Sequence, residues 1–302
     1  MSTQKAINEI SNADPVKELT QQEWKKAWYR FKKSKLSMIG LSIVLIIILA
    51  AVFAPVIAPY SEDVGSVVKF DQAHMPPSAD HWFGTDEVGR DIFSRILYGA
   101  RLSLTLGFTV MIIAIVIGVP LGLIAGYFGG KVNSIIMRIT DIFLSIPSLV
   151  LALAVAAIME PSLINTMIAV SFGWWPWFTR LVQGEVLTLK NEQYIQASIG
   201  IGTGKFRIMF KEILPNCISP IIVKATLDFG FVILLGASLG FLGLGAQPPI
   251  PEWGTMISEG RLYLPEIWWQ STFPGLFIFL TVLGFNLLGD GLRDVLDVQL
   301  ED

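Results

Sequence analysis

The sequence contains few charged residues. Only 16% of its 302 residues are Asp, Glu, Lys or Arg, whereas 53% are hydrophobic. Soluble globular domains average about 25% charged residues. A shortage of this size excludes an ordinary soluble domain and indicates a chain that lies largely in a lipid bilayer.

Cysteine and histidine are also scarce. The single cysteine, Cys217, excludes an internal disulfide bond and a cysteine metal cluster, and we expect it to be a small buried hydrophobe. The two histidines, His74 and His81, lie in one polar segment near several Asp residues. A zinc site is the alternative to ordinary solvated loop residues. Because the pair lacks a clear ligand spacing, we favour solvated loop residues.

Catalytic motifs are missing. The stretch GIGTGKF at Gly200–Phe206 resembles a phosphate-binding loop, which requires G-x-x-x-x-G-K-[ST] after a strand. Ile199 occupies the first glycine position and Phe206 replaces the hydroxyl residue, so we reject a nucleotide site. With no nucleophile elbow, zinc-protease motif or paired carboxylates in an aqueous context, we predict no enzyme activity, cofactor, metal or nucleic-acid partner.

Long apolar runs are abundant. A helix of about 20 residues crosses the ~30 Å hydrocarbon core of a bilayer. Six charge-free intervals are long enough, and the fifth helix is expected to begin earlier, near Cys217. We therefore predict an all-α membrane protein with six transmembrane helices. The intervals are Leu36–Ser61, Leu102–Gly130, Ile142–Met159, Pro161–Thr179, Phe229–Pro251 and Ile267–Gly289.

The distribution of Lys and Arg predicts the orientation. These residues are concentrated before the first interval, between the second and third, and between the fourth and fifth. Such an excess marks the cytoplasmic side of a membrane protein. We therefore expect both termini to face the cytoplasm.

Four regions follow along the chain. Residues 1–35 form a cytoplasmic tail in which Trp24, Trp28 and Phe31 recur at helical spacing among lysines. This spacing predicts a basic amphipathic helix on membrane lipids, with a regulatory or partner-binding helix as the alternative. The other regions are the first transmembrane helix (36–60), an external segment with a short surface helix around Arg90–Tyr98 (61–100), and a five-helix core (101–302).

The core contains the longest polar interval of the chain, Gln183–Asn216, which we call the coupling loop. Its pattern predicts two short helices joined at Gly202 and Gly204 and stopped by Pro215. A charged loop with helical periodicity between two apolar intervals lies in water and is typical of a docking surface. We expect apolar anchors at Ile195, Ile199, Phe206, Ile208 and Phe210.

The stretch YIQASIGIGTGKFRIMFKEILPN, which begins at Tyr194, resembles the Glu-Ala-Ala loop of the permease subunits of ATP-binding-cassette (ABC) importers. The matching positions are Gln196, Ala197, Ser198, Gly202, Leu214 and Pro215. Two positions depart from the motif, because Gln196 replaces its acid and Glu212 replaces its Ile. Small side chains let a partner approach closely, and charged residues form a rim around the apolar anchors. The rim consists of Lys205, Arg207, Lys211 and Glu212.

Three further stretches are similar to the "C" permease subunit of dipeptide and oligopeptide importers: residues 81–104, 180–198 and 289–297. The resemblance implies a type I importer permease fold in the cell inner membrane. It also implies a second homologous permease subunit, two cytoplasmic ATP-binding subunits that hydrolyse ATP, and an external solute-binding protein. Short peptides are the expected substrates. Nickel chelates and oligosaccharides are the alternatives within this class.

Two charged residues fall inside a predicted span. Lys224 and Asp228 lie four residues apart and therefore on one helical face. They are candidates for lining the translocation path. There are two alternatives: the two charges neutralise each other at a subunit interface, or Lys224 snorkels to the cytoplasm. A stand-alone secondary transporter is the alternative from another class. It would require more such groups, or broken helices in symmetric halves.

Overall fold

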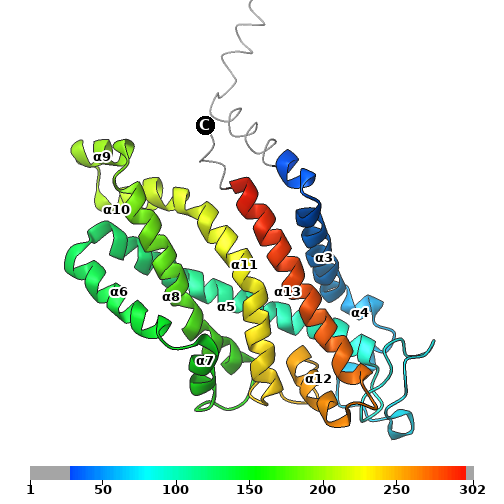
Figure 1. Cartoon of the computed structure of the whole chain (residues 1–302). Coiled ribbons are helices and arrows are strands. Elements are labelled where there is room, and N and C mark those ends of the chain that lie inside the picture. Colours follow the sequence, from blue (N-terminus) through cyan, green and yellow to red (C-terminus); the bar gives the residue numbers. More distant parts are fainter. Residues whose placement is uncertain (1–27, 297–302) are drawn as a thin grey trace, which may run out of the picture.

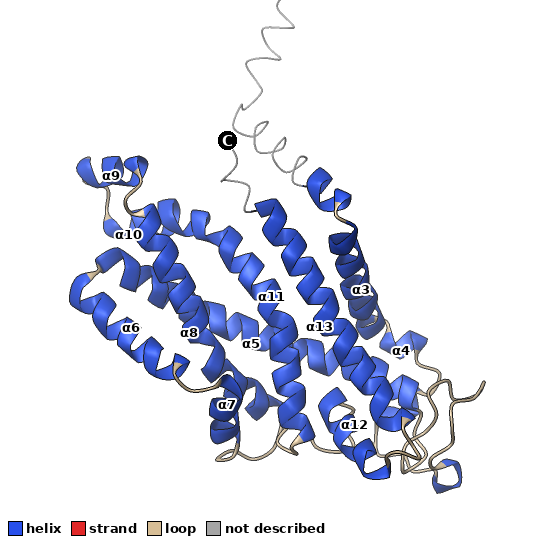
Figure 2. Ribbon diagram, viewed as in Figure 1, coloured by secondary structure: helices blue, strands red, loops and turns tan. Residues whose placement is uncertain are grey.

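The computed structural model describes residues 28–296, and within that range every regular element is helical (Figures 1 and 2). A single isolated bridge joins Thr85 and Asp91. Most of the predicted amphipathic helix of the N-terminal tail lies outside the described residues. The principal helices are α3 (Lys35–Val52), α4 (Ala54–Ile57), α5 (Ile92–Phe128), α6 (Gly130–Leu144), α7 (Ser148–Ala156), α8 (Leu163–Leu189), α9 (Gln193–Gly200), α10 (Lys205–Arg207), α11 (Leu214–Phe241), α12 (Trp253–Gly260) and α13 (Trp269–Leu296).

Among the described residues, four helices are long and apolar enough to cross a membrane, and α6 with α7 supplies a fifth if this bent pair is one span. The four are α3, α5, the helix from Lys205 to the end of α11, and α13. Helix α8 is also long enough at 27 residues but is not among them. The six-span arrangement therefore stays a prediction.

The pair α6 and α7 departs from the sequence prediction of one straight third span over Ile142–Met159. The two helices meet at an angle of 85°, at a break that contains Pro147. Proline has no N–H for the helical hydrogen bond and disfavours helical geometry in the residue before it, so the chain turns there. The predicted interval thus begins at the end of α6 and continues through α7.

The segment that precedes α5 is also corrected by the structure. The expected separate surface helix around Arg90–Tyr98 is the first part of α5, a continuous helix of 37 residues that Asp91 caps by accepting a hydrogen bond from Ser94 N. Ile92 and Ile96, expected on the membrane surface, are completely buried. They pack in the main core cluster because the preceding loop and α12 cover this end of the bundle.

Three glycines bring α5 and α8 into close contact. Gly118, Gly122 and Gly126 recur every four residues and so lie on one face of α5. A Cβ atom added at Gly122 would lie 2.7 Å from the carbonyl oxygen of Thr179, and one at Gly126 would lie 2.6 Å from Cβ of Val186. In a bilayer, helices associate through this close packing of small residues.

The coupling loop and α11 form a continuous helical connection. A π-helical segment, Ile208–Ile213, joins α10 to α11, and Pro215 lies in the first turn of α11. The expected stop at Pro215 is therefore wrong. A proline is tolerated in a first turn, and the wider π-helical turn precedes it. The expected start of this helix near Cys217, ahead of its charge-free interval, is confirmed, because α11 begins at Leu214, and Cys217 is completely buried as predicted.

Candidate functional site

The tip of the coupling loop is a helix–turn–helix unit. Helix α9 ends in a turn where Gly202 has φ = +80°, and Thr203 N donates a hydrogen bond to Ser198 O at 3.0 Å. Glycine adopts this left-handed conformation without the penalty that a Cβ atom brings. Gly204 then precedes α10 in an extended conformation. The two glycines therefore serve the backbone turn, as predicted.

Only some of the expected apolar anchors are accessible. Ile195 and Ile208 are completely buried, so they attach the loop to the helical bundle and were wrongly predicted as docking residues. The exposed apolar side chains at the tip are Ile199 (39%), Ile201 (83%), Phe206 (73%) and Phe210 (48%). We call these four residues the loop face. Sequence reasoning missed Ile201, although its place beside the turn glycine Gly202 is a signal of exposure.

Polar contacts hold the loop against its own base. The Gln196 side-chain amide donates to Lys190 O at 2.8 Å, and Lys190 Nζ donates to Tyr127 O at 2.7 Å. The side-chain amide of Asn216 lies 3.2 Å from the Tyr194 hydroxyl. Burial, followed by the nearby negative charges, raises the pKa of Tyr194, so its hydroxyl stays protonated at neutral pH.

The remaining predicted loop residues differ in accessibility. Ala197, Lys205, Arg207 and Pro215 are exposed, whereas Ser198, Glu212 and Leu214 are half-buried. Lys205 Nζ lies over the ring of Phe128 at 5.6 Å, which brings the loop next to the end of α5. The loop residues thus gather at one end of the bundle, where α3 begins and α13 ends (Figure 1).

Lys224 and Asp228 lie away from the loop, in α11, and contact each other. Lys224 Nζ lies 3.0 Å from Asp228 Oδ1 and 2.8 Å from Oδ2. The Trp174 indole N–H donates to Asp228 Oδ2 at 3.0 Å, and Lys224 Nζ lies 5.1 Å from the centre of the Trp177 ring. The two residues lie on one helical face, as their spacing predicts, and they form an ion pair within this chain that also joins α11 to α8.

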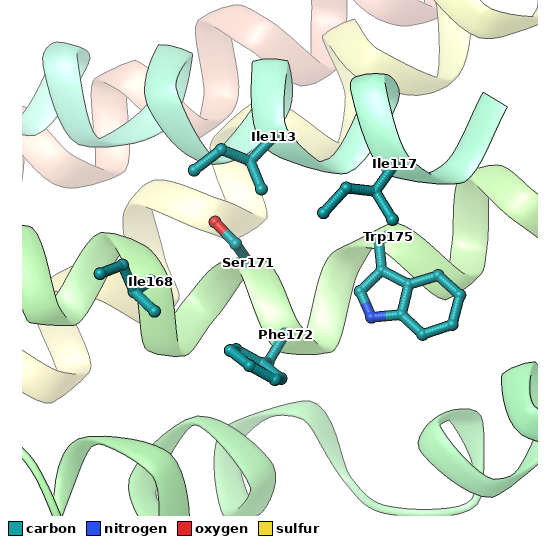
Figure 3. Close-up of a pocket in the computed structure, with 6 residues that line it drawn as sticks. All are labelled: Ile113, Ile117, Ile168, Ser171, Phe172 and Trp175. Atoms are coloured by element: carbon teal, nitrogen blue, oxygen red, sulfur yellow. The ribbon is translucent and has the colours of Figure 1, made fainter. Parts of the chain in front are cut away.

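The tryptophans of α8 have different environments. Trp174, Trp175 and Trp177 lie in the middle of the helix. Trp174 is buried against Asp228, whereas Trp177 is 44% exposed. Trp175 lines a pocket of about 180 Å³ between α5 and α8 (Figure 3). Its other lining residues are Ile113, Ile117, Ile168, Ser171 and Phe172.

A charged cluster closes the opposite end of the bundle. Arg95 is almost completely buried, with Nε 3.5 Å from Asp86 Oδ2 and Nη2 3.8 Å from Glu259 Oε2. Arg90 Nε donates to Asp86 Oδ2 at 2.7 Å. Burial, together with the nearby Glu87, raises the pKa of Glu259 to about 7 despite the two arginines.

The histidines lie beside this cluster. His81 is buried, and its Nδ1 lies 2.9 Å from Asp91 Oδ1, so the expectation of a solvated loop residue is wrong for His81. His74 lies against the ring of Tyr263 at 4.5 Å. Across residues 28–296, no group of three or more His, Cys, Asp and Glu side chains is arranged to hold a metal ion. Gly84, in the same segment, has φ = +74°, a left-handed conformation that favours glycine.

Two protein-family models match most of the chain. Residues 118–301 match the family model described as "Binding-protein-dependent transport system inner membrane component". Residues 22–77 match the model "N-terminal TM domain of oligopeptide transport permease C".

Curated relatives are similar over nearly their full length. The dipeptide transport system permease protein DppC of Alkalihalophilus pseudofirmus is 49% identical over 92% of this chain and 90% of its own length. The protein of the same name from Escherichia coli is 48% identical over 91% and 92%. The oligopeptide transport system permease protein OppC of Bacillus subtilis is 40% identical over 98% and 96%.

Among solved structures, an inward-facing conformation of the MetNI methionine ABC transporter has a similar fold. The likeness has a TM-score of 0.56 at 21% sequence identity, and covers 68% of this chain and 97% of the other. At this identity the likeness concerns the fold alone. The family models and the relatives lead to one conclusion: the chain belongs to the family of binding-protein-dependent transport system inner membrane components.

Proposed function

We propose that this chain is a membrane permease subunit of an ATP-driven importer of short peptides. The observation that carries the proposal is the 40–49% identity to dipeptide and oligopeptide permeases over almost the whole chain. Nickel chelates and oligosaccharides are the alternative substrates in this class. Membership of the family also implies ATPase subunits and a substrate-binding protein as partners.

The coupling loop is the site at which an ATPase subunit binds. Its loop face presents four apolar side chains outward, next to the exposed Lys205 and Arg207. A compact helical unit with apolar anchors and a charged rim suits a groove on a partner protein. Gln196 is already bonded to Lys190 O, so the contact that an acid makes at this motif position is made here by other residues.

The assembly spans the membrane as a heterodimer of two homologous permease subunits. In this chain α8 supplies the sixth span beside the five candidates, with both termini on the cytoplasmic side. Its Trp, Ser, Thr and Asn residues make α8 less apolar, and its extensive packing on α5 and α7 shields part of its surface. Lys224 and Asp228 line the translocation path between the subunits.

Substitution of the turn glycine tests the coupling role. We expect Gly202→Trp, in the assembled transporter, to keep ATP binding but to lose peptide-stimulated ATP hydrolysis and uptake, because the indole blocks the approach of the ATPase. Gly243→Trp is the matched control, since Gly243 also has a left-handed φ (+82°) and open space but lies at the other end of α11. Unchanged coupled transport by the Gly202 variant would contradict the docking role.

A further inference from the structure

The ion pair inside the bundle is held in one orientation. Asp228 is 9% exposed, and it receives Lys224 Nζ on both carboxylate oxygens and the Trp174 N–H on one of them. These contacts fix the carboxylate between α8 and α11. Lys224 therefore extends toward Asp228, one turn farther from the coupling loop, and does not snorkel toward the near end of α11.

The ammonium group keeps an accessible side. An ammonium has three N–H donors, and both carboxylate contacts of Lys224 go to a single residue. The Lys224 side chain is 28% exposed, and the Trp177 ring beneath it is 44% exposed. Arg180, three residues after Trp177 on α8, is also exposed and forms an ion pair with Asp141 of α6. Lys224 and Trp177 thus form one partly exposed surface, a cation beside an aromatic face.

Lipid is an unfavourable neighbour for this surface, because Lys224 lies within the candidate span Lys205–Phe241. Lys224 lies ten residues into α11, about 15 Å from its first residue at a rise of 1.5 Å per residue. Exposed ionisable groups at such a depth face a water-filled cavity or a polar partner, because their transfer into hydrocarbon is costly.

The chemistry of the surface matches one end of a peptide. A terminal carboxylate pairs with an ammonium whose donors remain accessible, and the adjoining peptide unit packs on an aromatic face. Asp228 moderates the attraction, because it already shares the charge of Lys224. Binding that is weak enough to reverse is what a translocation path requires.

We propose that Lys224, positioned by Asp228 and Trp174 and flanked by Trp177, binds the C-terminal carboxylate of a peptide in transit. This inference rests on the proposed function of peptide import. It assigns to the membrane subunit a selectivity for free peptide carboxylates, in addition to whatever the binding protein selects.

The test compares two peptides that differ only at the C-terminus, one with a free carboxylate and one with a carboxamide. Uptake is measured in vesicles that hold the complete transporter with saturating binding protein. The same binding protein serves every variant, so its own preference cancels when variants are compared. We expect Lys224→Met combined with Asp228→Asn to lower the uptake ratio of carboxylate to carboxamide about tenfold.

Two further variants keep the test decisive. Lys224→Arg retains the cation and should retain the preference, while Lys131→Met removes an exposed cation from α6 and should change nothing. Equal losses for both peptides in the double variant, or no change in the ratio, would overturn the carboxylate site. Absence of uptake of either peptide by the unaltered transporter, despite ATP hydrolysis, would instead contradict peptide import.

Discussion

At the scale of single residues, burial separates residues that sequence patterns treat alike. Ile195 and Phe206 both match an apolar docking anchor, yet one is completely buried and the other is 73% exposed. The shared helical face of Lys224 and Asp228 followed from their spacing alone, because helical geometry is local. The contact of Asp228 with Trp174 joins residues 54 positions apart, and no local pattern could reveal it.

Glu259 provides a pH-dependent prediction at this scale. Its folded-state pKa of about 7 lies above the ordinary value of 4.5, so the folded state holds the proton more tightly. The free energy of unfolding should therefore fall as the pH rises from about 4.5 to about 7, by up to about 3 kcal/mol from this group. Glu259→Gln should remove this part of the pH dependence.

The measurement is the difference between thermal midpoints at pH 5 and pH 8, compared between the unaltered protein and each variant. Titrating groups far from Glu259 contribute equally to the unaltered protein and to the variant, so their contributions cancel. Glu266→Gln, at an exposed carboxyl group between α12 and α13, is the matched control. The same pH dependence in the Glu259 variant as in the unaltered protein would refute the assignment.

At the scale of elements, the sequence predicted helices correctly where apolar runs are long. It predicted the ends of helices poorly where tertiary contacts determine where a helix begins or ends. Helix α5 begins at Ile92 because Asp91 caps it and α12 covers it, and both are contacts of the folded chain. Pro147 could have indicated the break between α6 and α7, since proline disfavours a continuous helix. The G-x-x-x-G spacing of α5 was a further local signal of close packing.

The glycine face of α5 gives the prediction at this scale. Gly122→Ile should separate α5 from α8, because its Cβ alone would lie 2.7 Å from the Thr179 carbonyl oxygen. Overpacking of this kind costs about 1–3 kcal/mol or more. We expect a lower thermal midpoint and a lower yield of folded protein in detergent. Gly184→Ile on α8, where no atom lies within 4 Å of the added Cβ, should leave both near their original values.

At the scale of the whole molecule, the coupling loop and the charged cluster lie at opposite ends of the helical bundle (Figure 1). The fold class and the family resemblance were available from composition and motifs, and the comparisons confirm the family. The number of spans was harder to establish. Helix α8 decides whether there are five spans or six. It carries polar and aromatic residues, and these are compatible with a bilayer only where neighbouring helices cover them.

The orientation is testable with single cysteines in a Cys217→Ser background. A membrane-impermeant maleimide should label Ile158→Cys and Ser66→Cys from outside intact cells, but label Ile201→Cys only after permeabilisation. This pattern requires α8 to cross the bilayer, since Ile158 and Ile201 lie on either side of it. Labelling of Ile201→Cys in intact cells would reverse the orientation, and labelling of Ile158→Cys and Ile201→Cys from one side would remove α8 as a span.

The continuous helical path from Lys205 to Phe241 has a mechanical consequence. Asp228 lies 23 residues beyond Lys205, so the arm between them is about 35 Å long at 1.5 Å per residue. A tilt of only about 10° at the loop would displace the far end of this arm by about 6 Å, roughly one helical turn. A tilt of this size would have to break the hydrogen bond between Trp174 of α8 and Asp228, because the displacement is larger than the 3.0 Å length of that bond.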